Sequence, residues 1–319
     1  MREPLLTVRD LRVTFPISRN FLGRVKRRIH AVDGVNFSIG EGETLGLVGE
    51  SGSGKSTTAR AILGLTRPSA GEIELDGRQL VGLSAEAMRS AYRDMQVVFQ
   101  DPMSSLNPRM TAEQNVAEPL VNFDSGTASQ IAARVKELFE QVGLRADQLG
   151  RYPHEFSGGQ RQRLCIARAM AIRPKLIICD EPVSALDVSV QAQVINLLGD
   201  LSKATGVSIL FVAHDLAVVE HISDRVAVMF QGQIVEIGET PEIYANPMHP
   251  YTKKLLASVL HADPSMNPAL PPSVAGGTRE AGAGCRFAPQ CPSATPTCQT
   301  SPPVLRRRGQ EHEVACHLA

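Results

Sequence analysis

The stretch that decides the fold is "GESGSGKST", residues 49–57. It fits the pattern G-x-x-x-x-G-K-[ST], with Gly49, Gly54, Lys55 and Ser56 at the fixed positions. An apolar segment typical of a strand precedes it, and a segment with helical periodicity follows it. Such a loop turns backbone N–H groups toward phosphate oxygens, while its lysine neutralises phosphate charge and its last hydroxyl can bind Mg²⁺. The residues expected to contact a nucleotide are Gly49, Ser51, Gly52, Ser53, Gly54, Lys55, Ser56 and Thr57.

The rest of the chain alternates strand-like and helix-like segments. Short β-branched runs with Gly-rich turns before residue 100 predict an antiparallel β-region, and the basic segment 19–28 between two of them predicts a solvated loop. Continuous apolar runs at residues 175–182 and 207–215 predict a mostly parallel sheet covered on both faces. The helical pattern at about residues 101–165 interrupts this sheet, so we expect an inserted helical subdomain. The fold class is therefore α/β.

Composition excludes several classes of protein. The 319 residues carry 33 Lys and Arg against 33 Asp and Glu, and this zero net charge does not favour a nucleic-acid partner. No uninterrupted apolar run approaches the length of a membrane span, and the start, "MREPLLTVRDLRV", is charged where a secretory signal needs an apolar region. We expect a cytosolic chain, in which disulfides are disfavoured.

Two acids follow a predicted buried strand in "LIICDEP", residues 176–182. Open α/β sheets bind ligands at the carboxyl edge of their strands, where Asp180 is expected to emerge. Glu181 comes next and points to another side, because consecutive strand residues alternate. We assign Asp180 as the Mg²⁺ partner and Glu181 as the general base that polarises the attacking water.

Gln100 and His214 end apolar strands in the same way. Gln100 closes "MQVVFQ", and His214 closes "VSILFVAH". Both are expected at the edge of the sheet that holds the phosphates. There His214 could hydrogen-bond a γ-phosphate or the attacking water.

The stretch "FSGGQRQRLCIARAMAI", residues 156–172, predicts a helix that starts near Gln160. The entry formed by Ser157, Gly158 and Gly159 leaves N–H groups free at the positive end of the helix dipole, which favours a second anion. This anion would belong to a second nucleotide or to the nucleotide of a partner. The alternative is an ordinary helix cap with flexible glycines.

These motifs together resemble the ATP-binding subunit of an ABC transporter, a P-loop NTPase. The phosphate loop, Gln100, "FSGGQ", "LIICDE", "SALD" and His214 stand in family order, and the resemblance covers about residues 5–260. Phe156 replaces the usual Leu at the start of the signature.

The resemblance implies a head-to-tail dimer of ATPase subunits with ATP and Mg²⁺. Each ATP is held between the phosphate loop of one subunit and the signature residues of the other. Asp187 then lies at the dimer seam, and Gln100 joins Ser56 and Asp180 at the metal. Phe15 is the candidate to stack on adenine. The signature residues expected at the partner's nucleotide are Ser157, Gly158, Gly159 and Gln160.

Two further stretches, at residues 98–109 and 246–259, resemble oligopeptide and dipeptide importers. The resemblance implies a second, different ATP-binding subunit, two membrane permeases and an extracytoplasmic substrate-binding protein, with this chain peripheral on the cytoplasmic face of the membrane. Residues 1–245 would form the nucleotide-binding domain and residues 246–319 an importer-type extension. Nickel, glutathione or antimicrobial peptides are alternative cargoes. A soluble ABC ATPase of DNA repair or translation is the rival class.

Four cysteines gather near the C-terminus, in "CRFAPQCPSATPTC" and "ACH". Their C-x5-C-x6-C-x17-C spacing fits neither paired zinc ligands nor ferredoxin runs. They form either a metal clip that supplies folding energy or four unrelated thiols. Resemblance to the importer tail favours a [4Fe–4S] cluster over zinc. Its ligands would be Cys285, Cys291, Cys298 and Cys316.

Overall fold

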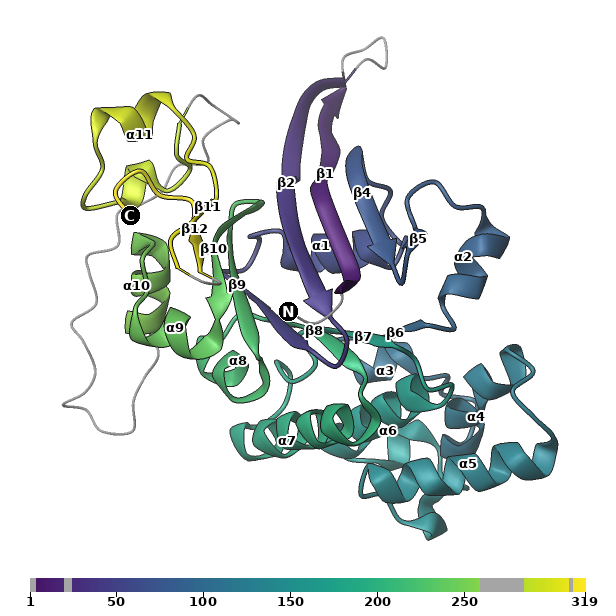
Figure 1. Ribbon diagram of the computed structural model, residues 1–319. Coiled ribbons are helices and arrows are strands. Elements are labelled where there is room, and N and C mark those ends of the chain that lie inside the picture. Colours follow the sequence, from purple (N-terminus) through teal and green to yellow (C-terminus); the bar gives the residue numbers. More distant parts are fainter. Residues whose placement is uncertain (1–3, 20–24, 259–283, 310–311) are drawn as a thin grey trace.

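The computed structural model describes residues 4–19, 25–258, 284–309 and 312–319, and their strands form two sheets (Figure 1). The smaller sheet contains, in spatial order, β2 (Val25–Gly40), β1 (Pro4–Arg19), β4 (Ala70–Leu75) and β5 (Arg78–Gln79). The larger sheet contains β11 (Arg306–Arg307), β12 (Glu313–Val314), β10 (Gln233–Glu239), β9 (Arg225–Phe230), β3 (Thr44–Val48), β8 (Ser208–Ala213), β7 (Leu176–Asp180) and β6 (Met95–Val98).

The directions of the strands confirm the predicted fold class. In the smaller sheet β1 pairs antiparallel with both β2 and β4. In the larger sheet the run β9–β3–β8–β7–β6 is parallel, and only the edge from β10 to β11 is antiparallel. The carboxyl ends of β3, β7 and β8 therefore meet at one edge, as parallel strands must.

The parallel strands are buried on both faces, as their unbroken apolar runs predict. Along β7, Ile177 and Cys179 pack into the core on the side of the long helices, whereas Leu176 and Ile178 pack into the core beneath the smaller sheet. This alternation follows from the two-residue repeat of a strand. The sheet is thus the middle layer of the molecule, and its edges remain free to carry polar side chains.

Helices cover the sheet and fill the zone between β6 and β7 (Figure 1). The helical pattern predicted for residues 101–165 is confirmed. No helix in the described ranges is both long enough and apolar enough to span a membrane. The α-helices are α1 (Lys55–Ile62), α2 (Ala85–Ala91), α3 (Pro102–Ser105), α4 (Ala112–Asn122), α5 (Ala128–Gln141), α6 (Gly158–Met170), α7 (Val188–Thr205), α8 (Leu216–Ile222), α9 (Thr240–Ala245), α10 (Pro250–Ala257) and α11 (Pro296–Thr300). Shorter 3-10 turns are η1 (Ala146–Gln148), η2 (Pro153–Glu155) and η4 (Ala288–Gln290).

The loop predicted for residues 19–28 is wrong at both of its ends. Strand β1 continues to Arg19 and β2 begins at Val25, and these two residues pair across the hairpin. The paired backbone extends the antiparallel ladder into the segment predicted as a loop, and Arg28 on β2 is exposed. Residues 20–24 of the predicted loop lie outside the described residues.

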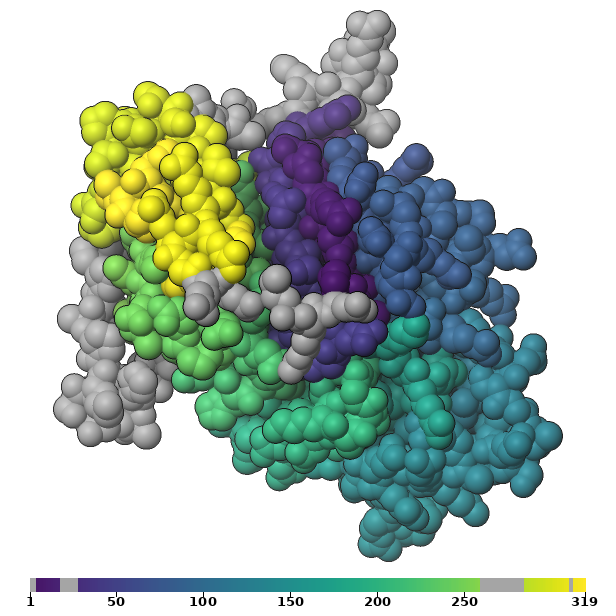
Figure 2. Space-filling view, viewed as in Figure 1, coloured from purple at the N-terminus to yellow at the C-terminus, as the bar shows by residue number. Residues whose placement is uncertain are grey.

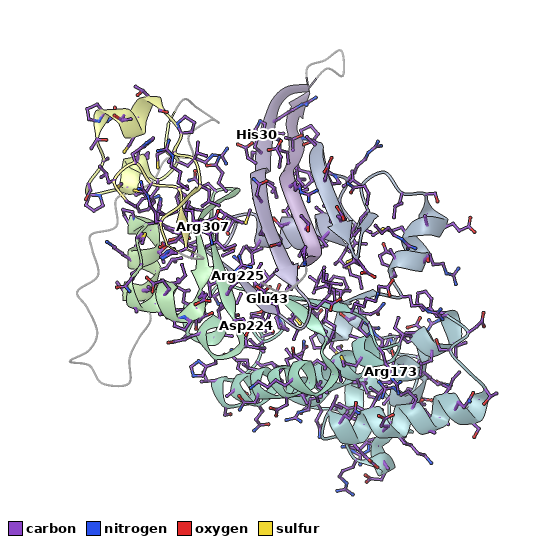
Figure 3. All side chains as sticks on the ribbon, viewed as in Figure 1. His30, Glu43, Arg173, Asp224, Arg225 and Arg307 are labelled. Carbon is purple, nitrogen blue, oxygen red and sulfur yellow. The ribbon has the colours of Figure 1, made fainter. Side chains whose placement is uncertain are left out.

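The amino end of β3 is held by charged neighbours (Figure 3). Arg225 donates to the Glu43 carboxylate at 3.0 Å, and Asp224 accepts the Thr44 N–H at 2.8 Å. Only 9% of the Glu43 side chain is exposed, so this ion pair is shielded from water. The strand that leads into the phosphate loop is therefore anchored at its start.

The C-terminal extension adds two strands to the edge of the larger sheet. Val314 of β12 pairs with Glu236 of β10, and β11 pairs with β12 in turn. Beside this junction, His312 lies 2.8 Å from the fully buried carboxylate of Glu236. Figure 2 shows the end of the extension, in yellow, seated on the green residues around α9 and α10. The sequence did not predict these short strands.

Candidate functional site

The phosphate loop connects β3 to α1 and needs glycine where the backbone is crowded. Gly54 caps α1 with a φ of 108°, in the left-handed region. A side chain there would collide with the Ala31 carbonyl oxygen, and one at Gly49 would collide with that of Met229. The loop is therefore packed directly against β2 and β9, and its N–H groups sit where α1 begins.

Lys55 lies inside the loop that precedes it. Its ammonium donates to the carbonyl oxygens of Gly49 at 2.7 Å and Glu50 at 3.1 Å, and the residue is 3% exposed. Burial lowers the pKa of the Lys55 ammonium, while the nearby carboxylates of Glu181 and Asp180 oppose that shift. A cation held this way is positioned to bind phosphate oxygens.

Ser56 and Asp180 are 124 positions apart in sequence and meet at the edge of the sheet. The Ser56 hydroxyl donates to Asp180 Oδ1 at 2.7 Å. Asp180 ends β7 and is 5% exposed, and this burial raises the pKa of its carboxyl group, although the Ser56 hydrogen bond lowers it. A hydroxyl beside a carboxylate offers the hard oxygen atoms that Mg²⁺ binds.

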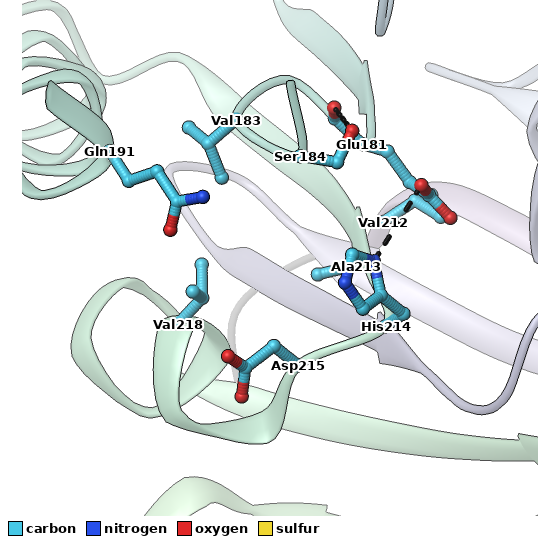
Figure 4. Close-up of a pocket in the computed structure, with 9 residues that line it drawn as sticks. All are labelled: Glu181, Val183, Ser184, Gln191, Val212, Ala213, His214, Asp215 and Val218. Atoms are coloured by element: carbon cyan, nitrogen blue, oxygen red, sulfur yellow. Dashed lines mark hydrogen bonds and ion pairs between the residues drawn. The ribbon is translucent and has the colours of Figure 1, made fainter. Parts of the chain in front are cut away.

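Glu181 and His214 line the same pocket, where their side chains approach one another (Figure 4). Glu181 Oε2 lies 3.7 Å from His214 Nδ1. The Glu181 backbone has a φ of 51°, an uncommon value for a residue other than glycine, and its N–H donates to Val212 O at 3.0 Å. The side chain of Glu181 is 19% exposed, so it remains open to a water molecule from the pocket.

Gln100 reaches the same site through Ser184, a residue that the sequence reasoning did not select. Gln100 Nε2 donates to Ser184 Oγ at 3.0 Å, and Ser184 Oγ donates to Glu181 O at 3.1 Å. Gln100, Ser184 and Glu181 thus form a hydrogen-bonded chain. Its place in the sequence could have indicated this role, because Ser184 begins "SALD" three residues after Glu181. Among the described residues, the Gln100 side chain makes no hydrogen bond to Ser56 or Asp180.

The signature turn begins α6, two residues earlier than the predicted start at Gln160. Ser157 and Gln160 form a reciprocal cap, since Ser157 Oγ accepts the Gln160 N–H at 3.3 Å and Gln160 Oε1 accepts the Ser157 N–H at 3.0 Å. A side chain on Gly159 would collide with Val190 of α7. Gly159 therefore lets α6 and α7 approach closely. In the described chain this turn contacts those helices rather than the cluster around Lys55.

Asp187 and Phe15 also lie apart from that cluster. Asp187 is the exposed N-cap residue of α7, and its side chain makes no capping hydrogen bond. Val188 next to it is 82% exposed. Phe15 lies on β1 opposite Ile29 and is 43% exposed. Both predicted contact residues are thus accessible to a ligand or a partner subunit.

The four C-terminal cysteines carry free thiols. The Cys285 N–H donates to Cys298 O at 2.7 Å and draws two cysteine segments together. Burial raises the pKa values of the Cys285 and Cys291 thiols. Each of the four sulfurs has a hydrogen-bond partner, namely the backbone N–H groups of Phe287, Ser293 and Leu318 for Cys285, Cys291 and Cys316, and the Thr295 hydroxyl for Cys298. Among the described residues, no three His, Cys, Asp or Glu side chains are grouped to hold a metal ion.

Comparison with known proteins decides the family. A family model described as "ABC transporter" matches residues 32–184, and one described as "Oligopeptide/dipeptide transporter, C-terminal region" matches residues 235–298. The oligopeptide transport ATP-binding protein OppF of Salmonella typhimurium is 47% identical over an alignment of 332 residues, which covers 99% of this chain and 96% of OppF. This chain belongs to the ABC transporter ATP-binding subunits of the oligopeptide/dipeptide importer subfamily.

Further comparisons agree with this family. The glutathione import ATP-binding protein GsiA of Escherichia coli is 54% identical over 263 residues, which is 82% of this chain and 42% of GsiA. Among solved structures, cbiO1 of Clostridium perfringens matches with a TM-score of 0.66 and 28% identity over 76% of this chain and 91% of cbiO1. A dimeric ATP-binding cassette bound to ADP and Pi matches with a TM-score of 0.65 and 29% identity, over 74% of this chain and 98% of its own. As a member of this ATPase family, the subunit hydrolyses ATP.

Proposed function

We propose that this chain hydrolyses ATP to power the import of dipeptides and oligopeptides through a membrane ABC transporter. The observation that carries the proposal is the meeting of Ser56 with Asp180, and of Glu181 with His214, at one edge of the sheet beside Lys55. The cargo class comes from the likeness to OppF along nearly the whole chain. Peptide-stimulated ATP hydrolysis by vesicles that contain the complete importer tests both parts.

Each residue at this edge has a proposed role in the reaction. Lys55 binds the β- and γ-phosphates, and Ser56, Asp180 and Gln100 hold Mg²⁺, which neutralises phosphate charge when it is bound. Glu181 accepts a proton from the attacking water, because its carboxylate is open to the pocket. His214 then contacts the γ-phosphate or orients Glu181, from which its ring is 3.7 Å away. Ser184 positions Gln100 through their hydrogen bond.

The exposed signature turn supports the proposal of a head-to-tail dimer. Ser157 and Gln160 satisfy one another within the chain, while the start of α6 stays open to an anion. We propose that this end binds the ATP held by a second, different ATP-binding subunit, with Asp187 at the seam. Phe15 stacks on adenine. The match to a dimeric cassette bound to ADP and Pi supports this arrangement.

The remaining partners follow from the same proposal. Two permeases and an extracytoplasmic binding protein complete the importer, and this subunit sits on the cytoplasmic face of the membrane. Residues 101–165 form the helical subdomain that docks the permeases, within a nucleotide-binding domain of residues 1–245. Residues 246–319 form the extension.

The cysteines of the extension are proposed to hold a [4Fe–4S] cluster. The hydrogen bonds that the four sulfurs make support this proposal, because such bonds tune clusters of this kind, and the thiols would lose their protons on binding the cluster. A bound cluster would tie together the segments that carry Cys285, Cys291, Cys298 and Cys316. Because the described side chains are not grouped as a finished site, the ligands would have to close around the cluster. Iron and labile sulfide in anaerobically purified protein, lost in Cys298→Ser but kept in Cys165→Ser, test this; colourless protein without iron contradicts it.

Glutathione is the second candidate cargo, and the 54% identity to GsiA favours it. The two cargoes are separated by competition. Uptake of a radiolabelled tripeptide by the reconstituted importer should be blocked by unlabelled peptides of varied sequence if peptides in general are the cargo. If glutathione alone competes, the first proposal fails and the second stands.

A further inference from the structure

The C-terminal extension touches the phosphate loop at its first variable residue, Glu50. The Glu50 N–H donates to the hydroxyl of Tyr251, on α10, at 2.9 Å. Tyr251 is fully buried among the rings of Phe230 and Phe287, and burial raises the pKa of its phenol, so the hydroxyl stays protonated. A buried, rigid ring therefore fixes the peptide that leads into the loop.

The same residue also holds the phosphate-binding lysine. Lys55 donates to Glu50 O at 3.1 Å, while Tyr251 accepts the N–H of that residue. One residue thus stands between the extension and the ammonium that binds phosphate. A shift of Tyr251 would be passed to Lys55 through a single residue.

Lys254 strengthens this contact from one helical turn further along α10. Residues three apart share a helix face, so Lys254 lies beside Tyr251. Its ammonium is 3.3 Å from Glu50 Oε1 and 3.2 Å from Gln290 Oε1. The pair is partly exposed and weak as an ion pair. Its importance lies in linking the turn η4, directly before Cys291, to the phosphate loop.

Arg286 makes a second connection on the other side of the loop. It follows Cys285 directly, and its guanidinium donates to Gln231 O and to the Asp33 carboxylate. The turn after Gln231 is bound to the loop, because Gly232 donates to Ser53 O at 2.7 Å and accepts the Asp33 N–H at 2.8 Å. Arg286 therefore holds the backbone that supports the rear of the phosphate loop.

The Gln231–Gly232 turn and the phosphate loop are both closely packed against the backbone of β2. A side chain on Gly54 would collide with Ala31 O, and Gly232 has no room for one without tight contacts to the carbonyl oxygens of His30 and Ala31. Close-packed backbone transmits displacement rather than absorbing it. The two connections therefore fix the loop from its first residue and from behind.

We propose that Tyr251, Lys254 and Arg286 are positioning residues that hold the phosphate loop in the shape that binds ATP. They act through Glu50 and through the Gln231–Gly232 turn, and none of them touches the nucleotide. The extension is thus part of the ATP site rather than an appendage. Modification of the cysteines next to Arg286 and η4 is expected to change nucleotide affinity.

Tyr251→Phe tests the first connection, with Tyr244→Phe as the matched control. Both changes remove one hydrogen-bonded phenolic hydroxyl; that of Tyr244 donates to Leu216 O, and not to the phosphate loop. Affinity of the full-length protein for Mg²⁺ with a non-hydrolysable ATP analogue is measured by calorimetry, together with the thermal midpoint. We expect Tyr251→Phe to weaken binding about 3- to 10-fold, the effect of one lost hydrogen bond, and Tyr244→Phe to change it less than about twofold.

The outcomes separate positioning from general destabilisation. If both phenylalanine variants weaken binding equally, or if Tyr251→Phe leaves binding unchanged, the proposal is wrong. Arg286→Ala should also weaken binding, with partial recovery in Arg286→Lys and no change in the exposed control Arg308→Ala. Should Arg286→Ala fail to fold, the Tyr251→Phe comparison decides alone.

Discussion

The carboxyl edge of the sheet and the C-terminal extension use polar residues in opposite ways. At the edge, Asp180 ends an apolar strand while Glu181 and His214 each directly follow one, and the side chains of Glu181 and His214 are partly exposed. In the extension, Tyr251 and His312 are buried, and each makes one long-range hydrogen bond, Tyr251 to the Glu50 backbone and His312 Nε2 to the Glu236 carboxylate. The edge is therefore built for chemistry, whereas the extension is built to hold other residues in place.

Glu181→Gln should have the largest effect on ATP hydrolysis, and it tests whether the reaction takes place at the carboxyl edge of the sheet. We expect the rate of ATP hydrolysis at saturating ATP to fall about 10²- to 10⁴-fold, because the general base is lost while the fold is kept. Steady-state phosphate release measures this, with ATP binding measured alongside. Glu220→Gln, an exposed change on α8, is the control. Unchanged hydrolysis in Glu181→Gln would remove its role as base.

Lys55→Ala should weaken ATP binding as well as lower the rate of hydrolysis. Loss of charged hydrogen bonds to the phosphates is expected to weaken ATP affinity about 10- to 100-fold. The exposed Lys203→Ala on α7 should bind ATP normally. Equilibrium titration with ATP and Mg²⁺ makes the comparison, and normal affinity in Lys55→Ala would argue against the phosphate-loop assignment.

His312→Ala, in the extension, should reduce stability while leaving ATP hydrolysis nearly unchanged. It removes the partner of buried Glu236, which still accepts N–H groups from Met248 at 2.6 Å and His249 at 3.0 Å. We expect the free energy of unfolding to fall by roughly 1–3 kcal/mol in urea titrations. The maximal hydrolysis rate should stay within about twofold. A large loss of hydrolysis rate without a loss of stability would contradict the assignment of His312 to stability rather than catalysis.

Ser184→Ala should have the smallest effect, on the hydrogen-bonded chain at the edge. Gln100 loses its partner, and the expected fall in kcat is about threefold with KM retained, since one neutral hydrogen bond is removed. Ser189→Ala, at an exposed position of α7, is the control. An increase in KM without a change in kcat would place Ser184 in substrate binding instead.

The sequence predicted the edge well because its signals are local. Asp180 and His214 each end an apolar run, and parallel strands bring such ends together. The glycines around Lys55 mark a loop that the fold then places at the same edge. The hydrogen bond between Ser56 and Asp180 realises that expectation across 124 positions.

The extension could not be predicted because its contacts are long-range and lack periodicity. Tyr251 and Glu50 are 201 positions apart, and nothing near either residue signals the other. Strands β11 and β12 have two residues each, too short for an alternating pattern. The pairing of His312 with Glu236 depends on β12 reaching the sheet edge, which only the tertiary structure determines.

The most direct test measures peptide uptake and ATP hydrolysis in the same vesicles, reconstituted with the complete importer. With the native subunit, a radiolabelled tripeptide should accumulate only when ATP is hydrolysed. With Glu181→Gln both activities should be lost, and with Glu220→Gln both should remain. Continued peptide accumulation with Glu181→Gln, or hydrolysis that never moves peptide in the native importer, would contradict the proposed function.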